Sequence, residues 1–271
     1  MIKLGMLGTL SLTDADGREV RAVLRQPRRL ALLAYLAAAT PRGFHRRDSL
    51  LALFWPDLDQ EHARAALRQA LHVVRDALGA EVIVTRGDEE VGVDFARMWC
   101  DVVAFDGAVA AGQLHEALEH YRGDLLNGFF IAGAGEFERW LESERGHLRE
   151  AAARSARALV EQSEAAGDWA AAAKWARRGT GLARHDEELL RRLITLLDRL
   201  GDRAGAVEAY EEFTKRLAAD LETEPAAETK ALLAAVRARE TVAPVELASV
   251  AFSERTPVGA AAEPALGGGA D

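Results

Sequence analysis

The chain has 271 residues, 49% of them hydrophobic and 28% charged, which is enough for one or two domains with buried cores. No apolar run is long enough to span a bilayer and no secretory signal opens the sequence. A single cysteine, Cys100, also excludes an internal disulfide, so we expect a cytoplasmic protein. The net charge is -9, yet residues 18–47 carry eight Arg and one acidic residue, Glu19, so this segment could bind a polyanion.

The N-terminal elements are predicted to be a strand hairpin followed by helices. Residues 2–23 alternate apolar and polar side chains around a turn rich in Asp and Gly, which is typical of short strands. Pro27 suits the first turn of a helix, and the apolar spacing continues to Pro41. A second helix is expected from Arg47 to Trp55, because a proline follows.

A longer helix is predicted over residues 60–78. Asp57 with Gln60 indicates its capped start, and Gly79 its end. Two short β-branched runs within residues 82–93 then predict a second hairpin. The order of strand hairpin, three helices and strand hairpin is that of a winged helix.

The rest of the chain is predicted to be helical and repetitive. Residues 165–186 align with residues 199–220 at an offset of 34, the period of tetratricopeptide helix pairs. The predicted fold is therefore mainly α with small β hairpins. An N-terminal winged helix-turn-helix fills residues 1–97, an α-helical tetratricopeptide-like repeat domain fills residues 98–240, and residues 241–271 form a disordered tail.

No constellation of residues predicts catalysis. The chain lacks a phosphate-binding glycine loop with Lys and a Gly-x-Ser-x-Gly motif. His115 and His120 miss the i, i+4 spacing that places two metal ligands on one helix face. The charged run at residues 136–145 is typical of a solvated helix face. We therefore expect no enzyme, no metal and no cofactor.

The helix at residues 60–78 carries the strongest functional signal. Its apolar stripe predicts one buried face, and the other face bears donors that could meet base edges in the major groove. These candidate base-reading residues are Arg64, Arg68, Gln69 and His72. The alternative is a solvated surface helix whose Arg side chains pair with Asp76 or Glu61. This helix alone favours neither reading.

Further arginines are candidates for phosphate or wing contacts. Four of them lie at predicted helix starts, where free N–H groups also suit an anion. Another shares the polar face of the long helix, and one lies at the tip of the second hairpin, where it could enter a minor groove. The set is Arg28, Arg29, Arg46, Arg47, Arg75 and Arg86.

Two stretches resemble one known family. Residues 28–79 read RRLALLAYLAAATPRGFHRRDSLLALFWPDLDQEHARAALRQALHVVRDALG and resemble the OmpR-type winged helix of Streptomyces antibiotic regulatory protein (SARP)-like activators. Residues 216–236 read RLAADLETEPAAETKALLAAV and resemble the end of their bacterial transcriptional activator domain. Both stretches occur in the family's order.

The resemblance implies sequence-specific binding to promoter direct repeats and recruitment of RNA polymerase. It places Arg68, Gln69 and His72 toward the groove and Arg86 on the wing. The loop of Pro56, Asp57, Leu58 and Asp59 corresponds to the segment that can contact polymerase in such proteins. One departure concerns the wing, where Gly-Tyr is usual after Arg-Gly and this chain has three acids after Gly87.

The predicted function is that of a DNA-binding transcriptional regulator, an activator. Its expected partners are double-stranded promoter DNA and RNA polymerase holoenzyme, with a homodimer on DNA and a ligand or protein at the repeat domain as further possibilities, and no membrane. The alternative is a protein-interaction scaffold whose winged helix binds protein, which the overall acidity and the acidic wing favour.

Overall fold

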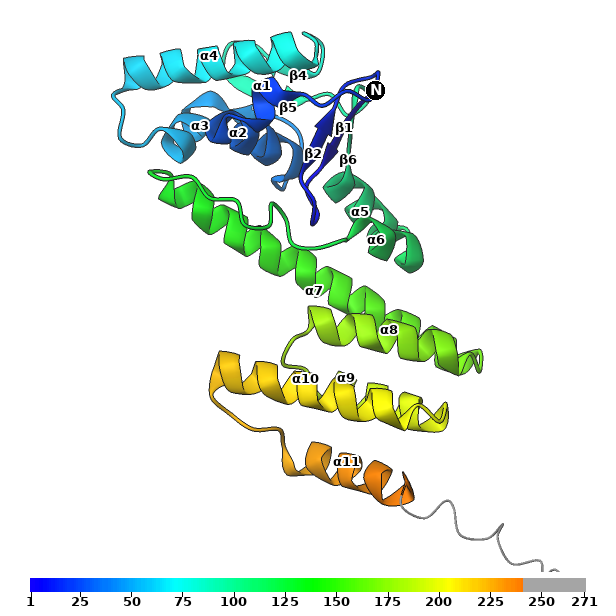
Figure 1. Cartoon of the computed structure of the whole chain (residues 1–271). Helices are drawn as coiled ribbons and strands as arrows, with labels where there is room; N and C mark the ends of the chain where they lie inside the picture. The colour runs from blue at the N-terminus through cyan, green and yellow to red at the C-terminus, as the bar shows by residue number, and fades with distance from the viewer. Residues whose placement is uncertain (241–271) are drawn as a thin grey trace, which may run out of the picture.

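The first sheet is built around strand β1 (Ile2–Gly5), which pairs antiparallel with β2 (Ser11–Thr13) as the predicted hairpin requires. The structure, a computed structural model, describes residues 1–240, so the expected tail lies outside the described residues. The hairpin prediction is wrong at its end, because Arg21–Leu24 form a short helix, α1, with Val23 buried. Beyond α1 the mainly helical fold is confirmed (Figure 1).

The first sheet has a third strand that the sequence pattern did not indicate. Strand β6 (Met98–Cys100) pairs parallel with β1, and Leu4 lies opposite Cys100. The proposed domain boundary after residue 97 therefore falls just before a strand that is still part of the N-terminal sheet.

Three helices form the core of the winged helix: α2 (Pro27–Ala38), α3 (Arg47–Phe54) and α4 (Gln60–Leu78). All three follow the predicted pattern. The start of α4 differs in its cap, because the Asp59 carboxylate, and not that of Asp57, accepts hydrogen bonds from the Glu61 and His62 amides at 3.1 and 3.0 Å. Asp59 directly precedes the first helical residue, so its carboxylate can reach these free N–H groups.

The second sheet forms the wing. Strand β5 (Glu90–Val93) pairs with β4 (Ile83–Arg86) in the predicted hairpin and with β3 (His45–Arg46), a two-residue strand that was not predicted. A side chain at Gly92 would place its Cβ 2.7 Å from the Gly43 carbonyl oxygen, so this position needs glycine. The wing is therefore tied to the segment that leads into α3.

The remaining helices stack below the winged helix (Figure 1). They are α5 (Asp101–Ala110), α6 (Leu114–His120), α7 (Gly135–Ala165), α8 (Trp169–Leu182), α9 (Glu187–Arg199), α10 (Arg203–Leu221) and α11 (Ala227–Glu240). The predicted repeat is visible at matching positions: Asp168 caps α8 through the Ala171 amide, and Asp202 caps α10 through the Gly205 amide, both at 2.9 Å. None of the helices described is long and apolar enough to cross a bilayer.

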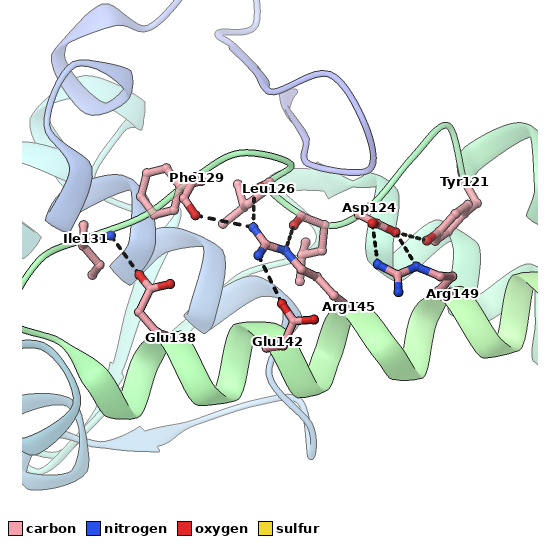
Figure 2. Close-up of polar contacts among 10 residues, drawn as sticks. Tyr121, Asp124, Leu126, Phe129, Ile131, Glu138, Glu142, Arg145 and Arg149 are labelled. Carbon is pink, nitrogen blue, oxygen red and sulfur yellow. Dashed lines mark hydrogen bonds and ion pairs between the residues drawn. The ribbon is translucent and has the colours of Figure 1, made fainter. Parts of the chain in front are cut away.

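A loop between α6 and α7 connects the two halves of the described chain, which are the N-terminal winged helix and the helical domain that follows it. It is held to α7 by Arg145, whose Nε and Nη2 atoms donate to the Leu125 and Leu126 carbonyls at 2.8 and 2.6 Å (Figure 2). The same loop bonds to the N-terminal segment, because Leu126 N donates to the Met6 carbonyl at 2.8 Å and Gly8 N to the Asp124 carbonyl at 3.1 Å. Both halves are thus hydrogen-bonded to one loop.

Aromatic side chains pack the winged helix onto α7. Tyr35 of α2 lies 4.8 Å from Trp140, and Phe54 of α3 lies 5.2 Å from Phe137, between ring centroids. The predicted solvated face at residues 136–145 is therefore wrong in part. Glu144 on this helix is buried, because the face that bears it covers the winged helix.

Candidate nucleic-acid interface

Helix α4 presents its polar face away from the repeat domain. Helices α2 and α3 lie between α4 and α7 (Figure 1). The predicted apolar stripe of α4 is buried against them, while the four candidate base-reading residues Arg64, Arg68, Gln69 and His72 are all exposed. The repeat domain therefore leaves this face accessible.

A groove of about 590 Å³ runs between α4, the start of α3 and the wing turn. Leu67 and Leu71 contribute apolar atoms to its lining. Five guanidinium groups and three carboxylates surround it, namely those of Arg46, Arg47, Arg64, Arg68, Arg75, Asp48, Asp88 and Glu89. The structure thus brings together two candidate base-reading residues and three candidate phosphate contacts, and adds acids that the sequence analysis did not assign to the site.

The ion pairs within the groove are loose. Arg46 lies 3.9 Å from Glu89 and Arg64 lies 3.8 Å from Asp48, and all four side chains are more than half exposed. The Arg68 guanidinium has no hydrogen-bond or ion-pair partner among residues 1–240. Because exposed pairs contribute little, these cations can be offered to an external anion at small cost.

Arg47 is a partly buried cation of the groove. Its backbone N donates to the Glu89 carbonyl at 2.8 Å, and its Nε is buried without a hydrogen-bond partner in the described residues. Burial, and next the nearby Arg75 cation, lower the pKa of the Arg47 guanidinium, whereas Asp88 acts in the opposite direction. An anion placed here would offset both the cost of burying this cation and its repulsion by Arg75.

The predicted pairing of the α4 arginines with Asp76 or Glu61 is not found among residues 1–240, and the residue that lies near Asp76 is a histidine. His72 Nε2 lies 3.3 Å from Asp76 Oδ2, although Arg64, Arg68 and Arg75 pair with neither Asp76 nor Glu61. Arg75 instead donates from Nε to the Ile83 carbonyl at 3.3 Å, which holds it beside the wing. His72 and Gln69 are exposed but do not line the groove.

Three predicted phosphate or wing contacts lie elsewhere. Arg28 donates to the Ala132 carbonyl at 3.2 Å, where the winged helix meets the loop before α7. Arg86 is bonded to Glu90 at 2.5 Å, and its guanidinium lies 4.9 Å from the centre of the Phe44 ring. Arg29 is partly buried and does not line the groove. The structure does not bring these three together with the others.

The expected polymerase loop is at the surface between α3 and α4. Pro56, Asp57 and Leu58 are exposed, Leu58 by 46%, and Asp59 is used as the helix cap. A Cβ on Gly133 would lie 3.4 Å from Asp57 Oδ2, so the loop before α7 borders this segment.

Residues 1–240 contain no group of three or more His, Cys, Asp or Glu side chains arranged to hold a metal ion. Cys100 is buried in the first sheet, and burial, reinforced by Asp101, raises the pKa of its thiol to about 12. It therefore stays a protonated, packed side chain at neutral pH.

Comparison with known proteins identifies a family for the helical half of the chain. Residues 103–237 match the family described as the bacterial transcriptional activator domain. The chain is a SARP-like protein with a bacterial transcriptional activator domain. The fold of this SARP-like chain is similar to the solved structure of Mycobacterium tuberculosis EmbR in complex with a low affinity phosphopeptide, with a TM-score of 0.56 and 23% identity over 88% of this chain. The match covers 65% of the EmbR chain, and no curated protein matches the sequence.

Proposed function

We propose that this SARP-like chain is a sequence-specific DNA-binding transcriptional regulator, an activator without catalytic activity that acts in the cytoplasm. The observation that carries the proposal is the exposed cationic face of α4, whose opposite face is buried. A helix of this kind fits the major groove, where Arg reads guanine and Gln reads adenine. Arg68, which has no hydrogen-bond or ion-pair partner among residues 1–240, is the first base-reading candidate, with Arg64, Gln69 and His72 beside it.

In this proposal, arginines of the protein groove contact the phosphate backbone of DNA. One side of α4, next to the wing, carries the cations of Arg46, Arg47 and Arg75. The sugar-phosphate backbone of DNA would pass there if α4 entered the major groove. Neutralising phosphates releases counterions, so the affinity should fall steeply with salt. Arg28, Arg29 and Arg86 lie outside the groove and stay separate candidates for phosphate or wing contacts, and DNA would have to displace the partners of Arg28 and Arg86.

The remaining partners belong to other surfaces. We propose that the exposed loop at Pro56, Asp57 and Leu58 contacts RNA polymerase holoenzyme, with Asp59 setting the start of α4. Two copies bound to a direct repeat would place a homodimer on DNA, and the repeat domain would serve docking or the sensing of a ligand or protein.

Selection of bound sequences from a random DNA pool tests the proposal. The full chain should enrich a direct repeat in which each half-site is short enough to be read by one recognition helix in the major groove. The competing scaffold function is favoured by the overall net charge of -9 and by the acidic wing. It predicts no enrichment, weak binding to random duplex at low salt and a shallow dependence of affinity on salt.

A further inference from the structure

The acidic turn of the wing lies in the same groove as the candidate phosphate contacts. Gly87, with a φ of 60°, turns the chain between β4 and β5, and Asp88 and Glu89 follow it. Both acids are exposed and both line the groove. Because Arg47 N is bonded to the Glu89 carbonyl, the turn is fixed beside the first residue of α3.

The groove holds more positive than negative charge near this turn. Arg75 and Arg68 both repel Arg47, since their cations disfavour the charged form of its guanidinium and lower its pKa. The acid that opposes this repulsion at Arg47 is Asp88. Glu89 lies 3.9 Å from the neighbouring Arg46. The carboxylates of Asp88 and Glu89 thus share the groove with the guanidinium groups of Arg46, Arg47, Arg68 and Arg75, and they form no close ion pair with them among residues 1–240.

Carboxylate and phosphate oxygens are interchangeable acceptors for guanidinium, because both offer paired, negatively charged oxygens to its planar donor fork. A phosphate that approached the groove would meet the cations that Asp88 and Glu89 already face. It would also meet the two acids themselves, which repel it at close range.

We propose that Asp88 and Glu89 act as a built-in competitor for DNA phosphate, a role that rests on the proposed function of this site. In the free protein they partly neutralise the Arg46, Arg47, Arg68 and Arg75 cluster, and DNA must displace them to bind. Because backbone contacts supply nearly all affinity for arbitrary sequence, the acidic wing keeps the chain from binding duplex DNA indiscriminately.

The test compares two double variants of the full chain that change the net charge equally. Asp88→Asn with Glu89→Gln removes the wing acids. Asp16→Asn with Glu81→Gln removes two exposed acids of the same half that lie outside the groove and pair with Arg18 and Arg97. Affinity for a duplex of random sequence is measured by fluorescence anisotropy over a series of salt concentrations, after circular dichroism has shown matching helical content.

The wing variant should bind random duplex about tenfold more tightly at low salt, with a steeper salt dependence. The control variant should stay within about twofold of wild type, because its acids lie outside the groove. Equal gains in the two variants would overturn the competitor role and leave DNA binding by the wild type intact. If wild type and both variants all fail to bind any duplex, the proposed function falls together with this inference. Should Asp88→Asn with Glu89→Gln not fold, Asp88→Asn alone is measured, with Asp16→Asn as its control, and the same outcomes apply.

Discussion

Asp124 links the loop between the two halves to α7 through its side chain. It accepts hydrogen bonds from Tyr121 at 2.8 Å and from Arg149 Nε at 3.0 Å (Figure 2). Burial would raise the pKa of this carboxyl, but the hydrogen bonds from Arg149 and Tyr121 outweigh it and lower the pKa below its usual range. The charged form of Asp124 is therefore the one that the folded chain stabilises.

Asp124→Asn is expected to lower the free energy of unfolding by about 1–2 kcal/mol at pH 7, because it weakens a charge-assisted hydrogen bond. The pKa of Asp124 is lower in the folded than in the unfolded chain, so its contribution is present above the unfolded value, near about 4. It is lost as the pH falls through the lower folded value. The melting temperatures of wild type and Asp124→Asn should therefore converge as the pH falls. Thermal denaturation of the two proteins between pH 7 and pH 3 measures this effect.

Asp16→Asn is the control for Asp124→Asn, since the Asp16–Arg18 pair is 69% and 77% exposed. It should leave the melting temperature nearly unchanged. A difference between wild type and Asp124→Asn that grew toward acid pH would contradict the role given to the Asp124 carboxylate.

At the scale of elements, the packing of α8 on α9 depends on one glycine. A Cβ on Gly179 would lie 2.6 Å from Leu189 Cδ2 and 3.5 Å from Ala156 Cβ, in a buried setting. Gly181, two residues later in the same helix, has open space at its Cβ position. Gly179→Ala should therefore cost about 1–3 kcal/mol through overpacking, whereas Gly181→Ala should be neutral or stabilise by about 0.5 kcal/mol.

Urea denaturation followed by circular dichroism compares the two glycine variants. Equal midpoints for Gly179→Ala and Gly181→Ala would show that α8 and α9 are not in close contact at this glycine. The comparison is sharp because both substitutions add the same methyl group to one helix.

The elements that sequence analysis predicted are those with local signals. Helix α4 was predicted at residues 60–78 because its apolar spacing lies within the segment and Gly79 follows directly after it. Strands β3 and β6 were not found, since each has only two or three residues and its partner lies far along the chain. Their pairing is decided by the packed tertiary structure, which no local pattern encodes.

The site was predicted in part for the same reason. The exposed face of α4 follows from helical periodicity, so Arg64 and Arg68 could be assigned. The contribution of Asp48 and the internal bonding of Arg28 depend on contacts between elements. The acids after Gly87 were visible in the sequence, but only the fold shows that they line the same groove as the arginines.

At the scale of the whole molecule, the aromatic contact between the halves should make residues 1–240 unfold together. Phe137 is fully buried, and its ring lies 5.4 Å from that of Trp140 and 5.2 Å from that of Phe54. Phe137→Ala should cost about 3–5 kcal/mol. Calorimetry should show one transition for wild type and a lower, broader or divided one for this variant.

Phe130→Ala is the matched control, because Phe130 lies in the adjoining loop and is 68% exposed. Its melting temperature should stay close to that of wild type. If Phe137→Ala melted like Phe130→Ala, the aromatic cluster would not couple the two halves.

The central claim is that the exposed face of α4 reads duplex DNA, and the most direct measurement is the affinity of Arg68→Ala for the selected duplex. Loss of one bidentate base contact removes about 1–3 kcal/mol, so Arg68→Ala should bind about 5-fold to 150-fold more weakly, with unchanged helical content. Arg18→Ala, which removes an exposed arginine outside the groove, should bind like wild type. Equal affinities for wild type and Arg68→Ala would contradict the account.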